Sequence, residues 1–379
     1  MRTRLCREIV LGAHGLRADW SVGFRSVVSA IVGIVGAIVA VEFGLRPFTT
    51  PNVPPEPRVA ADSLVQDTLV ARQMHEGVSE ARFSVGGARL TGNPPIPGAP
   101  TVVILGDSYV EARAIADTET MGSRFERQAR ASGDPVNVRQ YGWVGASPAR
   151  YLLVAETVRH RWAPRDIVVV LSDNDLDGKA LYGGAPPSVR VTRDGSIVPF
   201  PASVADAVPV VPLRWTLQGE LRERTWEFRA RISRLARLEA ARGPAPTQSP
   251  ADAAVEVLPD SVQLAMLPDA VIRSLAGAIG PRLAVLYLAG VRLTGDDTMP
   301  TTERRLLAAC RAAEIRCAST RDGMIAARAE GVIANGFWNT TPGNGHLNAA
   351  GHEIVALALW NLLRRSAPHR AQPVLAGAP

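Results

Sequence analysis

The chain has 379 residues, 46% of them hydrophobic, which is enough to bury a large core. Its formal net charge of +6 and its pI of about 9.8 would suit a polyanionic partner. The basic residues are almost all arginines, however, scattered along the chain without interleaved aromatic residues, so we exclude nucleic acid as a partner.

The first predicted element is a membrane anchor. Several arginines precede an apolar run from Val27 to Val41 that continues past Glu42. We predict a cytoplasmic tail over residues 1–25 and a single-pass anchor over 26–45, because positive residues stay on the cytoplasmic side. A cleaved signal peptide and a buried core helix are the alternatives. The rest of the chain would then face the periplasm or the cell exterior.

Residues 46–99 are predicted to form a stalk and a lead-in. Prolines concentrate between Pro47 and Pro57, where we expect a semi-rigid extended segment. The lead-in is predicted to contain a short helix from Asp62 to Ser79 and a strand from Arg82 to Leu90. At the other end of the chain, residues 366–379 are rich in alanine and proline and are predicted to be disordered.

Residues 100–365 carry the pattern of one α/β domain. Apolar runs at Val102–Leu105, Ile167–Leu171 and Leu283–Leu288 predict buried parallel strands, and helical patterns such as Tyr151–Arg159 separate them. We therefore expect a three-layer, doubly wound parallel sheet. Ligands of such sheets bind beyond the carboxyl ends of the strands.

Four short polar motifs follow predicted strands or precede a helix. Ser108 ends the string LGDS, Gly145 ends QYGWVG, and Asn174 lies in SDND. His346 lies in GHLNAAGH, just before the apolar helical pattern from Glu353 to Leu363. Serine is a poor nucleophile unless a base takes its proton, so Ser108 and His346 are the candidate nucleophile and base.

These motifs, in this order, resemble those of the SGNH, or GDSL-type, hydrolase superfamily of esterases, lipases and carbohydrate O-acyl hydrolases and transferases. The resemblance covers roughly Pro100 to Arg365. It implies a flavodoxin-like sheet and a Ser108 that attacks an acyl carbonyl. It also implies an oxyanion hole made by the backbone N–H groups of Ser108 and Gly145 and by the side-chain amide of Asn174. Such donors are worth about 3–4 kcal/mol each in measured oxyanion holes.

The chain departs from the family at the acid that orients the histidine. Members carry an aspartate two or three residues before it, whereas this chain has Asn344 and Gly343. Three hypotheses follow: a Ser-His dyad with Asn344 as the orienting group, a carboxylate from elsewhere such as Asp322, or weakened catalysis. We rank them in that order.

The remaining polar residues of the motifs are assigned structural roles. Asp107 and Asp175 are predicted to hold their loops through hydrogen bonds to the backbone, and His352 is predicted to be structural. The residues show neither metal-ligand spacing nor a phosphate-binding glycine pattern, so we predict no metal and no cofactor.

An insertion is predicted at about residues 176–265. Its first part is rich in turn residues, and Leu213–Arg242 is predicted to be a helix with apolar residues near helical spacing and arginines around them. A substrate-shaping cap, an amphipathic helix packed on the core and a contact with anionic lipid are all compatible with this pattern.

The redox states of the three cysteines depend on the cellular compartment of each part of the chain. Cys6 would be cytoplasmic and unpaired. Cys310 and Cys317 flank a predicted helix-to-strand turn, where they form either a disulfide, in an oxidising compartment, or two reduced buried thiols.

From the sequence, we predict a membrane-anchored, SGNH-like hydrolase of an O-acyl ester. An envelope glycan is the expected carrier of the ester, on grounds of location and family habit. Two alternatives stay open: an O-acyltransferase that passes the acyl group to a sugar, and a glycan-binding or scaffold protein that has lost full catalysis.

Overall fold

The computed structural model describes residues 28–37, 40, 69–73, 76–77, 79–84, 86–182, 187–200, 260–291, 293 and 297–364. The chain divides into two compact units, residues 1–50 with 210–246, and residues 51–209 with 247–379. In the first unit the described part is the apolar helix Val28–Ala37 with residue 40. The remainder of the predicted anchor, the helix over 213–242 and the tail over 366–379 lie outside the described residues.

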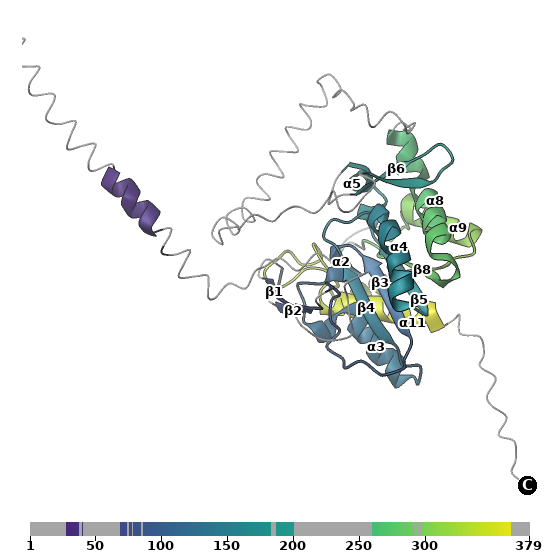
Figure 1. Cartoon of the computed structure of the whole chain (residues 1–379), viewed down its shortest axis with the longest axis horizontal. Helices are drawn as coiled ribbons and strands as arrows, with labels where there is room; N and C mark the ends of the chain where they lie inside the picture. Colours follow the sequence, from purple (N-terminus) through teal and green to yellow (C-terminus); the bar gives the residue numbers. More distant parts are fainter. Residues whose placement is uncertain are drawn as a thin grey trace, which may run out of the picture. The chain divides into compact units, whose positions relative to one another are not determined.

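A five-stranded parallel sheet forms the centre of the second unit (Figure 1). Its strands lie in the order β4 (Asn137–Gly142), β3 (Thr101–Gly106), β5 (Asp166–Leu171), β8 (Leu283–Tyr287) and β9 (Arg316–Ser319). All four pairings are parallel. Counted along the chain, this is the 2-1-3-4-5 order of a flavodoxin-like sheet. The predicted doubly wound α/β fold is confirmed.

Helices cover both faces of this sheet, which makes three layers (Figure 1). One core contains α4 (Pro148–Trp162), α8 (Asp260–Ile279) and α9 (Thr301–Ala312). The other contains α3 (Met121–Ala131), α10 (Arg321–Ala329) and α11 (Ala349–Arg364). Successive residues of β3 alternate between these cores, because side chains alternate across a strand. This two-sided burial explains why the central strands are continuous apolar runs.

One described segment, Asp260–Arg282, is long and apolar enough to cross a membrane by length and composition. In the structure, 44% of its apolar window is buried. The helix α8 that makes up most of it packs against α4 and α9. Those buried side chains belong to the core beside the sheet.

The predicted insertion begins with α5 (Gly178–Tyr182) and a two-stranded antiparallel hairpin of β6 (Ser188–Val191) and β7 (Ile197–Phe200). The hairpin packs against α4 and α8. Val191 donates its backbone N–H to the side chain of Gln263 in α8 at 3.1 Å. The described start of the insertion therefore lies on the same layer as α4 and α8.

The lead-in before the sheet contains a second antiparallel hairpin, β1 (Leu69–Gln73) and β2 (Ser79–Phe83). The prediction of a helix from Asp62 to Ser79 is therefore wrong where these strands lie. Each residue from Leu69 to Gln73 pairs with a residue of β2, and this non-local pairing overrides the local helical preference. The strand predicted from Arg82 to Leu90 is correct only at its start, since β2 ends at Phe83.

A buried arginine attaches this hairpin to the domain. Arg89 bridges to Gln140 of β4, and its guanidinium pairs with Asp117 and donates to the carbonyl of Ile115 at 2.8 Å. Burial lowers the pKa of Arg89 to about 9. Arg82 of β2 also donates its backbone N–H to Asp117, at 3.0 Å. These interactions join the lead-in to the short helix η3 (Asp117–Glu119).

Candidate active site

Ser108 lies at the start of α2 (Ser108–Glu111), directly beyond the carboxyl end of β3. Asp107 caps this helix by accepting the backbone N–H of Tyr109 at 3.0 Å. The turn is tight, because a Cβ at Gly106 would lie 2.4 Å from the side chain of Val110. The glycine of the LGDS string is therefore required for the sharp passage from strand to helix.

The hydroxyl of Ser108 lies 2.7 Å from Nε2 of His346. The two residues are far apart in the sequence, and the structure brings them together as predicted. His346 lies just before α11, whose first turn is capped by Asn348. The side-chain oxygen of Asn348 accepts the backbone N–H groups of Ala350 and Gly351, at 3.0 and 3.2 Å. Its amide group donates to two carbonyls of the preceding loop. His346 is thus held between the start of α11 and a preceding loop that Asn348 fixes through hydrogen bonds.

The other ring nitrogen of His346, Nδ1, contacts the carboxylate of Glu76. Glu76 belongs to the turn between β1 and β2, in the segment predicted to be a lead-in to the domain. The next residue, Gly77, donates its backbone N–H to the side-chain oxygen of Asn339 at 2.7 Å. A carboxylate on Nδ1 is the group that fixes the tautomer of a catalytic histidine and stabilises its cation. The side chains of Ser108, His346 and Glu76 therefore contact one another in series.

This arrangement corrects the prediction that Asn344 orients the histidine. The side-chain oxygen of Asn344 accepts the backbone N–H of Gly345 at 3.0 Å, and Glu76 occupies the position at Nδ1. Asp322, the second candidate, lies in the first turn of α10 and lines a different cavity. The carboxylate does come from elsewhere in the chain, as the second hypothesis required, but from Glu76.

Opposing effects act on the pKa of His346. Burial of the ring lowers it, whereas the hydrogen bond and charge of Glu76, helped by Asp107 and Glu111, raise it. The net pKa lies above the ordinary histidine value. The side chain is still 40% exposed, which leaves it accessible from solvent.

Behind Ser108 lies a buried polar network. Ser172 donates its hydroxyl to the carboxylates of Asp107 and Asp175, at 3.3 and 3.1 Å, and Tyr151 donates to Asp175 at 3.1 Å. Burial raises the pKa of both aspartates, and for Asp175 the charge of Asp107 adds to the effect. Both carboxyls hold loops through backbone N–H groups, in agreement with their predicted structural roles.

Gly145 and Asn174 follow the carboxyl ends of β4 and β5, the two neighbours of β3. Gly145 has a φ of +68°, a conformation that side chains disfavour. Asn174 lies in the 3₁₀ turn Asp173–Asp175, which is closed by a capping box between Ser172 and Asp175. Both predicted donors are therefore at the same edge of the sheet as Ser108, where the strand order reverses.

A small cavity of about 100 Å³ opens beside the side chains of Ser108, His346 and Glu76. Glu76, Ser108 and His346 line it, together with apolar or aromatic side chains that include Tyr109, Val144 and Leu347. The rings of Tyr109 and His346 pack at 5.2 Å between their centres. The cavity gives a small ligand access to the hydroxyl of Ser108.

His352 lies on α11 and is 1% exposed. Its Nδ1 accepts the backbone N–H of Met121 at 3.1 Å, which joins α11 to the start of α3. Burial lowers the pKa of His352 to about 3, so the ring is neutral. Its predicted structural role is confirmed.

Cys310 and Cys317 form a disulfide, which decides between the two states left open from the sequence. The bond joins the last turns of α9 to the edge strand β9. Disulfides of this kind persist in oxidising compartments.

The chain matches no family model and no curated protein. Several solved structures are similar to it. An α/β hydrolase from the metagenome of Lake Arreo, Spain, shares 10% identity at a TM-score of 0.38, over 70% of this chain and 96% of that one. Axe2, an acetylxylan esterase from Geobacillus stearothermophilus, shares 11% at 0.36, over 69% and 93%. TesA shares 13% at 0.36, over 70% and 98%. None of these likenesses assigns an activity to this chain.

Proposed function

We propose that the protein is a serine-dependent hydrolase of O-acyl esters. The observation that carries this proposal is the continuous contact from Ser108 through His346 to Glu76. A hydroxyl, an imidazole and a carboxylate in this order are the equipment that acyl transfer to serine requires. The absence of an aspartate just before His346 was the reason to consider a non-catalytic scaffold. The contact between Glu76 and Nδ1 of His346 removes that reason.

In the proposed reaction, Ser108 Oγ attacks the acyl carbonyl while Nε2 of His346 takes the hydroxyl proton. Glu76 stabilises the imidazolium that forms. The tetrahedral intermediate collapses, the C–O bond to the alcohol breaks, and His346 returns its proton to the departing oxygen. Water then attacks the acyl-enzyme with His346 again acting as base, and Ser108 is regenerated.

We assign the stabilisation of negative charge on the carbonyl oxygen to the hydrogen-bond donors at the edge of the sheet. The backbone N–H groups of Ser108 and Gly145 donate no hydrogen bond within the described part of the chain. These two N–H groups are therefore available to an oxyanion. We assign the side-chain amide of Asn174 as the third donor because its motif resembles that of the SGNH hydrolases. Removal of one such donor costs about 10²–10³-fold in kcat in a measured case.

The cavity beside Ser108 favours a short acyl group. Its volume of about 100 Å³ is small beside the ~300–1,000 Å³ of sites that hold drug-sized ligands. We infer that an acyl group of acetyl size enters it and that the alcohol part lies outside. Transfer of the acyl group to a sugar would use the same residues as far as the acyl-enzyme, with a hydroxyl in place of water.

We further propose that the reaction takes place outside the cytoplasm, on a domain tethered by the anchor at residues 26–45. The disulfide between Cys310 and Cys317 supports an oxidising compartment. A reporter fused after Pro379 and assayed for periplasmic or exterior activity tests this location. Activity only in the cytoplasm would contradict it.

The activity is tested with a fluorophosphonate probe on the full-length protein in detergent. We expect the wild type to label and to hydrolyse p-nitrophenyl acetate, and Ser108→Ala and His346→Ala to do neither. Matched controls are Ser132→Ala and His160→Ala, which remove an exposed serine and an exposed histidine elsewhere. A folded wild type that neither labels nor hydrolyses the ester overturns the proposal.

A further inference from the structure

Tyr109 directly follows the nucleophile in the chain, and the proposed reaction gives it no role. Its ring packs on the imidazole of His346, with 5.2 Å between the ring centres and 59° between the ring planes. It also lines the cavity of about 100 Å³ beside Ser108. The phenol ring therefore borders the place where an ester lies when His346 acts on it.

The hydroxyl of Tyr109 is available to a ligand. Within the described part of the chain, its backbone N–H bonds to Asp107 and its ring contacts His346, but its hydroxyl has no hydrogen-bond partner. The side chain is half-buried, and its oxygen is not sealed from solvent as the Nε1 atom of Trp143 is. A tyrosine hydroxyl usually finds a partner when its ring is buried. The hydroxyl of Tyr109 lacks one and remains accessible.

This hydroxyl is a hydrogen-bond donor rather than an anion. Burial, helped by the charges of Asp107 and Glu76, raises the pKa of Tyr109 to about 12. The phenol therefore keeps its proton at any pH at which neutral His346 is the base. The partner that it lacks is an acceptor, and an ester brings acceptor oxygens into the cavity.

The contact between Tyr109 and His346 indicates which ester oxygen accepts this hydrogen bond. The carbonyl oxygen is assigned to the donors beyond the carboxyl ends of the strands. The alcohol oxygen must approach Nε2 of His346, because the imidazolium gives its proton to the departing group. The carboxylate of Glu76, which stabilises the imidazolium, also disfavours negative charge on that oxygen. A phenol donor that packs on the same imidazole offsets this effect.

We propose that Tyr109 is a catalytic residue whose hydroxyl donates a hydrogen bond to the departing alcohol oxygen. As the C–O bond breaks, that oxygen takes the proton of His346 and keeps the hydrogen bond from Tyr109, which retains its own proton. The inference rests on the proposed function, since it concerns the same reaction. It favours esters of unactivated aliphatic alcohols, whose oxygen gains the most negative charge, over thioesters, whose sulfur is a weak acceptor.

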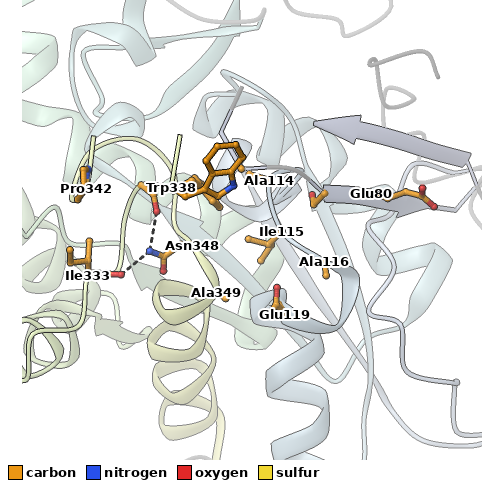
Figure 2. A pocket seen from close by; sticks show the side chains of 14 residues that line it. Glu80, Ala114, Ile115, Ala116, Glu119, Ile333, Trp338, Pro342, Asn348 and Ala349 are labelled. Carbon is orange, nitrogen blue, oxygen red and sulfur yellow. Dashed lines mark hydrogen bonds between the residues drawn. The ribbon is translucent and has the colours of Figure 1, made fainter. Parts of the chain in front are cut away.

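The alcohol part of the ester has space next to this oxygen. A second cavity, of about 690 Å³, shares Ala114 and Ile115 with the cavity beside Ser108. Figure 2 shows these two residues on the side of the larger cavity opposite Asn348. Asn348 caps the helix that begins just after His346, so the larger cavity extends from the side of the base. Its volume lies within the ~300–1,000 Å³ typical of small-molecule sites.

Two competing roles of Tyr109 lead to different results. A ring that only packs against His346 acts without its hydroxyl, so Tyr109→Phe would then behave as the wild type does. A hydroxyl that donates to the carbonyl oxygen acts similarly on every ester, because that oxygen gains negative charge whatever the leaving group is. Esters that differ only in the leaving group therefore separate the three roles.

The test measures kcat/KM of full-length protein in detergent for ethyl acetate, S-ethyl thioacetate and p-nitrophenyl acetate. The first two differ in one atom, and the third has a leaving group that spreads its charge over an aromatic ring. We expect Tyr109→Phe to lower kcat/KM about tenfold on ethyl acetate, the effect of one hydrogen bond, and less than about threefold on the other two. The matched control is Tyr141→Phe, which removes a buried hydroxyl that accepts from Nε1 of Trp162 at 2.9 Å. It should leave the ratios between the three esters unchanged.

The pH profile shows whether the variant acts through the base. Tyr109→Phe keeps the ring on His346, so we expect the rising limb of kcat/KM to stay at the pH of the wild type. A shifted limb, an equal loss on all three esters, or no loss on ethyl acetate overturns the inference and leaves the proposed function standing. A wild type that hydrolyses none of the three esters and does not label with the fluorophosphonate probe overturns both.

Discussion

Replacement of Glu76 by glutamine is the change that most directly tests the site. Glutamine keeps the size of the side chain and a hydrogen-bond acceptor but removes the charge that faces the imidazolium. It can also present its amide N–H₂ to Nδ1 and so favour the wrong tautomer. We therefore expect Glu76→Gln to fold as the wild type does and to lose most of its turnover.

The size of the loss follows from the geometry. Two unit charges about 4 Å apart near a protein surface interact by about 4 kcal/mol at an effective dielectric constant of ~20. That energy corresponds to a factor of about 10³ in rate. The side chains of His346 and Glu76 are 40% and 22% exposed, so solvent screens part of the interaction. We expect kcat on p-nitrophenyl acetate to fall about 10²–10³-fold, below the ~10⁴-fold of a buried triad.

The pH profile gives an independent readout. Neutral His346 is the active base, so kcat/KM rises with pH through the pKa of the free enzyme. Because Glu76 raises that pKa, its removal moves the rising limb to lower pH while the plateau falls. The matched control is Glu156→Gln, which removes an exposed glutamate that also lies next to a histidine, His160, at 3.6 Å. If Glu76→Gln leaves both the plateau of kcat/KM and the pH of its rising limb unchanged, Glu76 is not the carboxylate that supports His346.

Three further changes test the supports of the site. Gly77→Ala places a Cβ 2.8 Å from the ring of Phe337 at a φ of +73°, so we expect it to displace the neighbouring carboxylate and lower kcat at least about tenfold, with near-normal circular dichroism. Replacement of Cys310 and Cys317 by alanine opens a short loop and should lower the free energy of unfolding by about 2 kcal/mol in urea titrations; equal stability of the two forms would refute this. The pKa of His352 is lowered to about 3, so the unfolded chain binds one more proton between about pH 6 and pH 3, and stability falls as the pH decreases through that window. His352→Leu should make this decline shallower by up to about 1.4 kcal/mol per pH unit, as measured by denaturation at several pH values.

The fold could be predicted from the sequence because its strands are buried on both faces. Such strands are continuous apolar runs, and Val102–Leu105, Ile167–Leu171 and Leu283–Leu288 all coincide with strands of the sheet. The residues that follow these strands necessarily meet at one edge. The position of Ser108 at the same edge of the sheet as Asn174 and Gly145 was therefore predictable from local pattern and topology.

The acid was not predictable in the same way, because its position depends on tertiary pairing. Residues 69–83 have weak and mixed local preferences, and they form a hairpin only because β1 and β2 pair and Arg89 attaches them to Asp117 and β4. A glutamate before a glycine is common turn chemistry. Nothing in the local sequence of Glu76 distinguishes it from the other exposed acids of the chain.

The hairpin also changes where the functional domain begins. Its predicted start at residue 100 includes the nucleophile, the base and the oxyanion donors but leaves out Glu76. In the structure, the described residues between 69 and 99 belong to the same compact unit as the sheet, and Gly77 is hydrogen-bonded to the loop that carries Phe337 and Trp338. The hairpin, the loop that carries Trp338 and His346 are therefore joined by direct contacts. The cavity of about 690 Å³ adjoins the Ser108 cavity, and Gly77 and Glu80 line it. A change in the hairpin should therefore alter the acid and this cavity together, because the same turn and strand place Glu76 on the histidine.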